Sequence, residues 1–562
     1  MPCFRRLFCL VLALLIFRTG VYSQSIPAFP GAEGFGAHST GGRGGDVYIV
    51  TNLKADGEGS FLKGIQTAPA AGRTIVFAVS GFIPINKPKL KASKITIAGQ
   101  TAPGDGVCLR KSSLFISGED IIMRFIRIRH GKDGNGDDCI NPDGQAKNLI
   151  IDHCDMMFSK DENFSMFRSA PPTLTYQWSV NAWGLQSHSA GGLWLVDHAT
   201  VHHTLWAHNH TRNPKLIRPG LFDWTNNVTF GWDIGFNLSG AETAGTYKVN
   251  IRGSSFVPGG KAKEAIFGGG TAPDGNIPFS VHMNDCGFSK SKGNPLEATV
   301  KDYAIIAPGS VYNKQATPFP QTLDANPGNP RAAIIGVPLA VDDRITAFKK
   351  ILSQVGATRM EVNPARPLRD EVTALLVDDV INQRRRIIQD PAELGLGDGG
   401  FGNLKSTPAP VDRDRDGMPD EWETALGSNP AVDDHNEALP ASGGFINEPT
   451  YFPPRTPAGY TRLEEYLHFL AIPHGMVAAS SAGKPSHLEI DLTKFTSGFT
   501  KSPAFKISAA SGGTVTLGGS GGCMATFQPK PGHTGRAKFD FTVTDAEGSS
   551  WTQTCALLVT GR

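Results

Sequence analysis

The sequence predicts an all-β protein whose main part is a parallel β-helix, and three observations support this fold class. The 562 residues include 65 Gly and 39 Pro, which is typical of a chain with many turns. Short β-rich segments recur between about residues 95 and 285, with centres roughly 21 to 30 residues apart, the spacing of a solenoid whose turns cannot bury their apolar faces alone. The stretches between them are rich in Gly, Asn, Asp and Ser, so helical crossovers are not expected.

The β-rich segments are KITIAG, DIIMRFIRIR, NLIIDHCDMM, LTYQWSV, TVHHTLWAH, NVTFGWDI, YKVNIRGSSF and FSVHMNDCGF. A β-sandwich or a propeller is the alternative architecture. In those folds the same runs would be separated by shorter, hairpin-forming turns.

The first residues, MPCFRRLFCLVLALLIFRTGVYSQ, predict a secretory signal peptide at residues 1–23. Arg5 and Arg6 precede an apolar run that extends from Leu7 to Phe17, and the small residue Ser23 suits a cleavage site. A transmembrane anchor is the alternative, but the run is shorter than the ~20 apolar residues that span a bilayer. We therefore expect a secreted protein, extracellular or periplasmic, without a membrane anchor after cleavage.

The charge balance and the cysteines argue against two classes of site. With 54 Lys and Arg against 52 Asp and Glu, the net charge is +2, whereas a nucleic-acid-binding protein is normally strongly basic. No CxxC spacing occurs that would indicate a metal-thiolate site. The even number of cysteines that remain after signal cleavage permits disulfides, and Cys523–Cys555 is the pair we expect, because both lie in one short C-terminal β region.

Three polar residues lie at coil edges of the predicted solenoid: Asp138 in GDDCIN, Asp161 in SKDENFS and Arg212 in HTRNP. Equivalent positions on adjacent coils lie about 4.8 Å apart, the strand spacing of a sheet. Residues on successive coils, about 25 positions apart in sequence, can therefore share one site. We expect these three side chains to line one groove.

Several motifs, in the same order along the chain, resemble the pectate lyase family of polysaccharide lyases. They are AFPGAEGFGAHSTGGRGGDVYIVTNL, GRTIVFAVSGFI, NLIIDHCDMMFSKDENFS and VHHTLWAHNHTRNPKL, which extend over residues 27–260 together with the coils around them. The resemblance implies a right-handed parallel β-helix and an anionic polysaccharide substrate, pectate, a polymer of galacturonic acid. It also implies cleavage by calcium-assisted β-elimination, which leaves unsaturated sugars.

The resemblance assigns the calcium ligands to acidic residues on neighbouring coils. It carries this role to Asp138 in DDCI and Asp161 in KDENFS, with Glu162 as a supplement. Calcium is a hard cation that takes carboxylate oxygens, so it can neutralise the substrate carboxylate while the C5 proton is removed. Ser165 stands where the family has another acid, which leaves fewer fixed carboxylates. The alternative is that Asp138 and Asp161 only close β-turns, where Asp is common.

The stretch HTRNPKLIR carries three cations at three-residue spacing, Arg212, Lys215 and Arg218. By resemblance, Arg212 is the base that takes the C5 proton, and Lys215 and Arg218 bind substrate carboxylates. An arginine base needs a lowered pKa, because its ordinary pKa is above about 12, and both desolvation and neighbouring cations lower it. Two alternatives stay open: a carboxylate clamp with another residue as base, or a solvated face of three cations.

A further departure from the family falls in LQSHSAGGLW, where the family often has a lysine that contacts substrate. The nearest equivalent here is Ser189, and His188 beside it is the candidate for that contact. The alternative for His188 is a loop residue that only forms hydrogen bonds.

Two pairs of neighbouring polar residues on the predicted strands are interpreted as structural. Asp152 and His153 in IIDHC are explained better by packing and hydrogen bonding than by catalysis. His202 and His203 suggest a metal site at first. Consecutive strand residues point to opposite faces, however, so these two cannot easily share one ion.

After residue 285 the solenoid pattern fades and two helices are expected. ITAFKKILSQVG places apolar residues at helical spacing before Gly356, a good terminator, and RDEVTALLVDDVI is the second helix. Both would pack against the solenoid or close its end, since an uncovered terminal coil exposes apolar surface and strand edges. The apolar positions of the first helix are Phe348, Ile351, Leu352 and Val355.

The segment DRDRDGMPDEWE, residues 412–423, fits the EF-hand calcium loop D-x-D-x-D-G-x5-E. Gly417 permits the tight turn, and GYTRLEEYLHFL would be an accompanying helix. The alternative is an acidic surface turn, and the expected role of the ion is structural. The predicted ligands of this second calcium ion are Asp412, Asp414, Asp416, Met418 through its carbonyl, Asp420 and Glu423.

The last part of the chain alternates in polarity, as in AKFDFTVTD, and predicts a C-terminal β-sandwich. FQPKPGHTGRAKFDFTVTDAEGSSW resembles immunoglobulin-like or cadherin-like accessory domains, for which a spacer role is favoured over polysaccharide binding. The predicted domains are a signal peptide (1–23), the β-helix (24–335), a helical or extended segment on it (336–405), an EF-hand-like module (406–475) and the sandwich (476–562).

Together these features predict a secreted, monomeric polysaccharide lyase that uses Ca²⁺ and acts on pectate or a related polyuronate, giving unsaturated oligogalacturonides. A glycoside hydrolase on the same type of solenoid, with paired carboxylates and water, is one alternative. A non-catalytic adhesin or carbohydrate-binding solenoid is the other. No nucleic-acid partner is expected.

Overall fold

The structure is a computed structural model that describes residues 26–561, apart from 167–172, 186–187, 218–219, 239–246, 260–264, 269–278, 290–293, 311, 321–335, 440–444, 446–458 and 482–483. The signal peptide predicted at residues 1–23 and Arg218 lie outside the described residues. Within the described ranges, none of the helices has the length and apolar character needed to cross a membrane.

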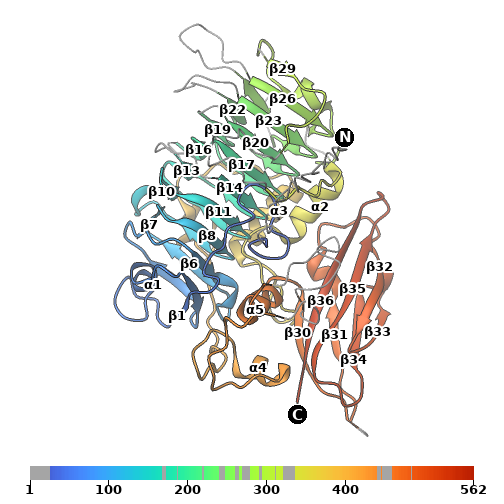
Figure 1. The fold of residues 1–562 in the computed structure, drawn as a ribbon. Coiled ribbons are helices and arrows are strands. Elements are labelled where there is room, and N and C mark those ends of the chain that lie inside the picture. Colours follow the sequence, from blue (N-terminus) through green and yellow to red (C-terminus); the bar gives the residue numbers. More distant parts are fainter. Residues whose placement is uncertain are drawn as a thin grey trace, which may run out of the picture.

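Three sheets wind into a solenoid, the blue-to-green body of Figure 1. The eleven-stranded sheet contains β1 (Asp46–Val50), β2 (Arg73–Phe77), β5 (Ile95–Ala98), β8 (Glu119–Arg124), β11 (Lys147–Asp152), β14 (Thr173–Gln177), β17 (His198–His202), β20 (Leu221–Thr225), β23 (Tyr247–Arg252), β26 (Phe279–Asn284) and β29 (Tyr312–Lys314). The eight-stranded sheet contains β4 (Lys89–Leu90), β7 (Ser112–Ile116), β10 (Asn135–Pro142), β13 (Glu162–Met166), β16 (Ala190–Trp194), β19 (Lys215–Leu216), β22 (Phe236–Leu238) and β25 (Ile266–Gly268). The ten-stranded sheet contains β3 (Gly81–Pro84), β6 (Val107–Arg110), β9 (Arg127–Arg129), β12 (Asp155–Met157), β15 (Val180–Ala182), β18 (Leu205–Ala207), β21 (Val228–Phe230), β24 (Ser255–Val257), β27 (Gly287–Phe288) and β28 (Val300–Lys301).

Neighbouring strands in these sheets come from successive coils and run parallel, which confirms the parallel β-helix. Strand β11, for example, pairs with β8 before it and β14 after it. Only β27 and β28, among the described pairs of the solenoid, are antiparallel. A strand thus meets its partner one full coil later, and the other two sides of the coil act as the crossover that parallel pairing requires.

The β-rich segments of the sequence mostly form two strands on either side of a corner. DIIMRFIRIR forms β8 and β9 around Phe125, and NLIIDHCDMM forms β11 and β12 around His153. Trp178 and His203 occupy the same corner on the next two coils, and all four residues have φ between +49° and +54°. Their rings stack with centroid distances of 4.8, 5.8 and 4.4 Å. This stacking helps to offset the cost of a left-handed backbone at residues other than glycine.

The two polar pairs on these strands have structural contacts. The buried Asp152 carboxylate pairs with Arg124 at 2.7 Å and accepts a hydrogen bond from Gln177 Nε2 at 2.9 Å. The expectation that His202 and His203 face opposite ways is wrong, because His203 has left the strand at the corner and the two Nδ1 atoms are 3.0 Å apart. Burial lowers the pKa of both imidazoles below its ordinary value.

The inside of the solenoid is filled with apolar side chains stacked in register. Each residue of such a row pairs with its equivalent on the next coil, so every coil buries its apolar face against its neighbours. The rows of the three sheets meet in one cluster. One row on the eleven-stranded sheet is Ile97, Met123, Ile151, Tyr176, Val201, Trp224, Ile251 and Met283.

Residues 26–45, which we call the N-terminal strap, cross the outer face of the eleven-stranded sheet. The hydroxyls of Thr175 and Thr200 accept hydrogen bonds from Gly36 N at 2.9 Å and Phe35 N at 3.2 Å. A Cβ on Gly36 would come within 2.0 Å of the Leu149 carbonyl oxygen. The strap approaches the sheet so closely there that only glycine fits.

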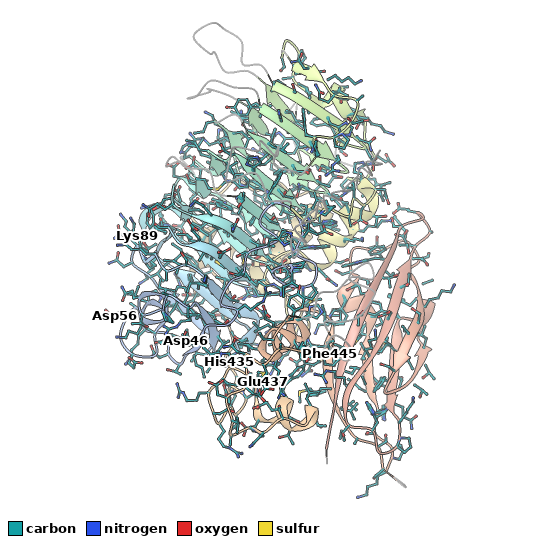
Figure 2. The ribbon with its side chains drawn as sticks, in the orientation of Figure 1. Asp46, Asp56, Lys89, His435, Glu437 and Phe445 are labelled. Atoms are coloured by element: carbon teal, nitrogen blue, oxygen red, sulfur yellow. The ribbon has the colours of Figure 1, made fainter. Side chains whose placement is uncertain are left out.

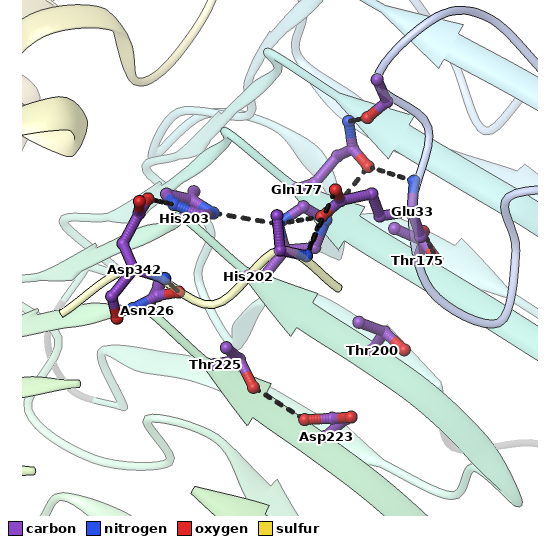
Figure 3. Close-up of polar contacts among 12 residues, drawn as sticks. Glu33, Thr175, Gln177, Thr200, His202, His203, Asp223, Thr225, Asn226 and Asp342 are labelled. Carbon is purple, nitrogen blue, oxygen red and sulfur yellow. Dashed lines mark hydrogen bonds and ion pairs between the residues drawn. The ribbon is translucent and has the colours of Figure 1, made fainter. Parts of the chain in front are cut away.

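A chain of polar groups joins the strap to the segment at residues 336–343 (Figure 3). Glu33 N donates to Gln177 Oε1 at 3.3 Å, and the same oxygen lies 3.1 Å from His202 Nε2. His203 Nε2 lies 2.9 Å from Asp342 Oδ2 at the far end. Burial raises the pKa of Glu33 to about 7, and the negative charge of Asp342 adds to this effect.

We expect Glu33 to make the fold less stable as the pH rises from about 4.5 to about 7. The unfolded chain loses this proton near the ordinary pKa of 4.5, whereas the folded chain keeps it to about 7, so ionisation favours the unfolded state across this window. Glu33→Gln should remove the effect, which is worth at most about 3 kcal/mol. Denaturant unfolding at about pH 5 and about pH 8 measures the difference.

Glu58→Gln is the control for this prediction, because Glu58 is an exposed glutamate on the same solenoid. It should keep the wild-type difference in stability between the two pH values. The prediction fails if Glu33→Gln shows the same pH difference as the wild type.

Two helices, α2 (Arg344–Gln354) and α3 (Glu371–Ile381), pack on the outer face of the ten-stranded sheet (Figure 1). Their apolar side chains join Val180 and Leu205 of that sheet in one cluster. The helices therefore cover the side of the solenoid. The apolar positions expected in the first helix, Phe348, Ile351, Leu352 and Val355, are all buried.

The C-terminal part contains two short helices and a β-sandwich beside the solenoid (Figure 1). The helices are α4 (Asp420–Leu426) and α5 (Arg462–Ala471). One sheet of the sandwich has the order β30 (His474–Ala478), β36 (Ser550–Thr560), β35 (Gly535–Thr544) and β32 (Ala504–Ser511), and the other has β31 (Leu488–Asp491), β34 (Met524–Pro529) and β33 (Gly513–Gly518).

The expected disulfide Cys523–Cys555 is wrong, because both cysteines are free. Cys555 lies in the middle of β36 and points into the core of the sandwich, where it pairs across the sheet with Phe539. Cys523 lies in the turn before β34, on the other sheet. The two cysteines belong to the same small domain, but they lie on different sheets and their sulfurs do not meet. Burial raises the pKa of the Cys555 thiol far above its ordinary value, which makes it unreactive.

Candidate active site

The candidate site lies where three neighbouring strands in the middle of the eight-stranded sheet, β13, β16 and β19, begin. Glu162 is the first residue of β13 and pairs with Ala190, the first residue of β16. Ala190 also bridges to Thr211, just before β19. This register brings residues from three distant stretches of sequence to one edge.

The predicted residues Asp138, Asp161 and Arg212 meet at this edge. Arg212 forms an ion pair with Glu162, and its Nη1 lies 3.9 Å from Asp161 Oδ1. Asp138 Oδ1 accepts a hydrogen bond from the backbone N–H of Glu162 at 2.8 Å. His188 Nδ1 pairs with Asp161 Oδ1. Donor atoms of Asp161, Glu162 and His188 all lie within 4.8 Å of one another, as in a metal site.

The electrostatics of the two described cations fit a site that meets an anionic ligand. Burial lowers the pKa of Arg212 below its ordinary value, although the charges of Asp161 and Asp138 oppose this effect. Burial also lowers the pKa of Lys215, and the positive charge of Arg212 lowers it further. The positive charge of Arg212 therefore acts on Lys215.

Four asparagines that sequence reasoning missed hold the Arg212 loop in place. Asn209 Nδ2 donates to Asn213 Oδ1 and to Asn181 Oδ1, both at 3.1 Å, and Asn163 Nδ2 donates to Asn209 Oδ1 at 3.1 Å. All four side chains are buried. Arg212 follows with a left-handed backbone, φ +56°. Asparagine is common in turns, so nothing in the sequence singled these residues out.

The two serines at which the sequence departs from the resembled pattern are both buried. Ser165 is buried on β13, three residues after Glu162, and pairs with Leu193 of β16. Ser189 is fully buried and accepts a hydrogen bond from His210 N at 3.0 Å. His188 next to it keeps 39% of its side chain exposed, so it is the one of the two that a ligand can reach.

Four of the residues predicted as EF-hand ligands form a separate cluster on the loop before α4 and in α4 itself. Asp412, Asp414 and Asp416 have oxygens within 4.8 Å of one another, and Glu423 joins Asp416 within the same distance. Met418 N donates to Asp416 Oδ1 at 2.9 Å, and the Met418 side chain is buried. Asp420 turns away from this cluster. Its carboxylate accepts a hydrogen bond from the backbone N–H of Arg413 at 2.9 Å and pairs with that guanidinium at 3.0 Å.

Comparison with curated proteins gives matches over most of the chain. A protein of Emericella nidulans described as probable pectate lyase C is 33% identical over 448 residues, which are 78% of this chain and 95% of that protein. The chain belongs to the pectate lyase family. Probable pectate lyase C of Aspergillus flavus is also 33% identical, over 417 residues, 74% of this chain and 90% of its own length. As a member of this family, the protein is a lyase.

Two further comparisons concern the parts of the chain. Residues 481–557 match the family model of a bacterial Ig domain, in agreement with the sandwich observed there. The crystal structure of jun a 1, the major allergen from cedar pollen, aligns with a TM-score of 0.40 at 19% identity and covers 58% of this chain and 92% of the allergen. This pectate lyase family member thus carries an Ig-like sandwich after its solenoid.

Proposed function

We propose that this enzyme is a secreted monomer that cleaves pectate, or a related polyuronate, by calcium-assisted β-elimination and leaves unsaturated oligogalacturonides. The names of its relatives support the substrate class, and the apolar segment within residues 1–23 supports secretion. The observation that carries the proposal is the cluster in which Arg212 contacts two carboxylates, Asp161 and Glu162, beside Lys215.

The residues present fit a calcium ion at this edge. Asp138 on β10, Asp161 just before β13 and Glu162 at the start of β13 offer hard oxygen donors on neighbouring coils. The Glu162 side chain is 3% exposed and pairs with Arg212. Calcium held there supplies positive charge opposite the substrate carboxylate. We assign His188 to contact with the substrate, because it reaches both Asp161 and solvent. Arg218, outside the described residues, has the same proposed role.

Arg212 is the proposed base. In its neutral guanidine form it takes the C5 proton and becomes a guanidinium, and the electron pair of the C5–H bond forms the C4–C5 double bond. The C4–O bond to the next sugar breaks, and the leaving oxygen takes a proton from water. Burial favours this role because it lowers the pKa of the guanidinium. Lys215 binds the carboxylate on C5 and so holds the C–H bond toward Arg212. No water adds to the sugar ring, which distinguishes the reaction from hydrolysis.

The test is incubation of the full-length protein with demethylated and methylated pectin, with calcium and with a chelator. We expect soluble products that absorb in the ultraviolet through their C4–C5 double bond, more from the demethylated polymer, and loss of activity with the chelator. New reducing ends without this absorbance would identify a glycoside hydrolase instead. Binding of the polymer without any cleavage would identify a non-catalytic solenoid.

A further inference from the structure

A set of carboxylates without hydrogen-bond partners gathers around α4, from the loop before it, the helix itself and the segment after it. Both oxygens of Glu423 and both oxygens of Asp414 are buried without a hydrogen-bond partner, and so is Oδ1 of Asp434. Glu423 is 0% exposed. Buried carboxylate oxygens without partners are costly, so their convergence points to a cation that satisfies them.

Asp434 lies outside the EF-hand motif but belongs to the same cluster. Its carboxylate shares a region within 4.8 Å with oxygens of Asp416 and Glu423. Its backbone N–H donates to Asp416 Oδ2 at 3.3 Å, and Arg462 of α5 pairs with its other oxygen. Arg462 thus orients Asp434 so that Oδ1 is left for the cluster. Asp420, the ninth residue of the motif, is directed to Arg413 instead.

The same loop lies between the solenoid and the sandwich. Gly417, φ +91°, is so close to Val47 and Val76 on β1 and β2 that a Cβ would lie 3.2 and 3.5 Å from their side chains. Met418 and Trp422 are buried in one cluster with Val76 of the solenoid and with Ala556 and Leu558 of β36. The residues that would hold the ion are therefore directly joined to the apolar contact between the two bodies.

A second contact lies on the other side of Asp434. His435 Nε2 and Asn436 Nδ2 lie 3.0 and 2.8 Å from the Gly45 carbonyl oxygen, at the start of the solenoid. Figure 2 shows His435 and Glu437 beside this edge of the solenoid, near Asp46. Glu437 pairs with Arg462 at 2.6 Å. Asp434 therefore links the acidic cluster to a segment already fixed on the solenoid.

We propose that this cluster is a calcium site in which Asp434, and not Asp420, completes the ligands, and that the ion fixes the loop between the solenoid and the sandwich. Calcium takes six to eight oxygen ligands, and a set of carboxylates together with one backbone carbonyl matches this preference. The ion is structural and independent of the one proposed beside Arg212. Its carboxylate ligands are those of Asp412, Asp414, Asp416, Glu423 and Asp434.

The test compares full-length wild type, Asp434→Asn and Asp420→Asn, each freed of metal and then titrated with calcium alone. Calcium should raise the unfolding midpoint of the wild type and of Asp420→Asn by on the order of 5 °C, and that of Asp434→Asn by less than about 1 °C. The calcium-induced shift is compared, and not the absolute midpoint, because Asp434→Asn also loses its ion pair with Arg462. Pectate cleavage by Asp434→Asn at saturating calcium shows that this variant folds.

Hydrogen exchange locates the effect. In the wild type, calcium should slow exchange of the amides at residues 412–437 and in β36, and Asp434→Asn should lack this protection. The assignment of Asp434 would be overturned if calcium raised the unfolding midpoint of Asp434→Asn as much as that of the wild type. It would also be overturned if Asp420→Asn lost as much of this increase as Asp434→Asn. Protection confined to the loop, with no change in β36, would overturn the role of the ion between the two bodies.

Discussion

Arg212→Lys should lower kcat on pectate by about 10²–10⁴-fold while KM changes little, the loss that follows removal of a positioned base. Lysine keeps the positive charge that binds carboxylates. It cannot place a nitrogen where the guanidinium of Arg212 now lies between Asp161 and Glu162. Initial rates from the ultraviolet absorbance of unsaturated products, measured over a range of pectate concentrations, separate kcat from KM.

Arg252→Lys is the matched control. Arg252 is also a partly buried arginine of the solenoid, 16% exposed against 21% for Arg212, and it pairs with Asp223 at 2.9 Å. It lies on β23, away from the edge that carries Arg212, so its variant should retain wild-type kcat. If Arg212→Lys raises KM and leaves kcat intact, Arg212 is a carboxylate clamp and another group is the base.

The sequence predicts the solenoid well because each coil must bury its apolar face in the same way, and this requirement repeats. It does not reveal the corners. Phe125, His153, Trp178 and His203 adopt left-handed backbones without the glycine or proline that normally marks a turn. Their stability depends on the ring of the next coil, a contact between residues about 25 positions apart. A prediction from local sequence signals therefore merges the two strands on either side of a corner into one.

The candidate site shows the same limit. Asp161 and Arg212 could be placed together because coil spacing alone brings their stretches to one edge. The motif at residues 412–423 could not reveal Asp434, which lies 11 residues after its last position and is oriented by Arg462 from α5. It also could not show that Asp420 pairs with Arg413. A motif identifies candidate ligands by their spacing in sequence. Ion pairs in the folded protein determine which of these carboxylates can still bind an ion.

Asp370 is the position where one substitution should affect stability most. Its carboxylate accepts hydrogen bonds from Arg129 Nη2 at 2.8 and 2.9 Å and lies 2.5 Å from Arg127 Nε. It also caps α3, accepting hydrogen bonds from the backbone N–H groups of Val372 and Thr373 at 2.9 and 3.1 Å. The three charged side chains are at most 3% exposed, so buried ion pairs hold the start of α3 on β9.

Asp370→Ala should lower the free energy of unfolding by about 3–5 kcal/mol. Among the residues that the structure describes, Asp155 would be the one carboxylate left beside the buried Arg127 and Arg129, at 3.8 and 3.7 Å. Asp343→Ala is the matched control. Asp343 caps α2 through two backbone N–H groups in the same way, but it lies at the surface, so its loss should cost only about 1 kcal/mol. Denaturant unfolding of both variants measures the difference. Equal losses would mean that the cap at Asp370 matters and the buried charges do not.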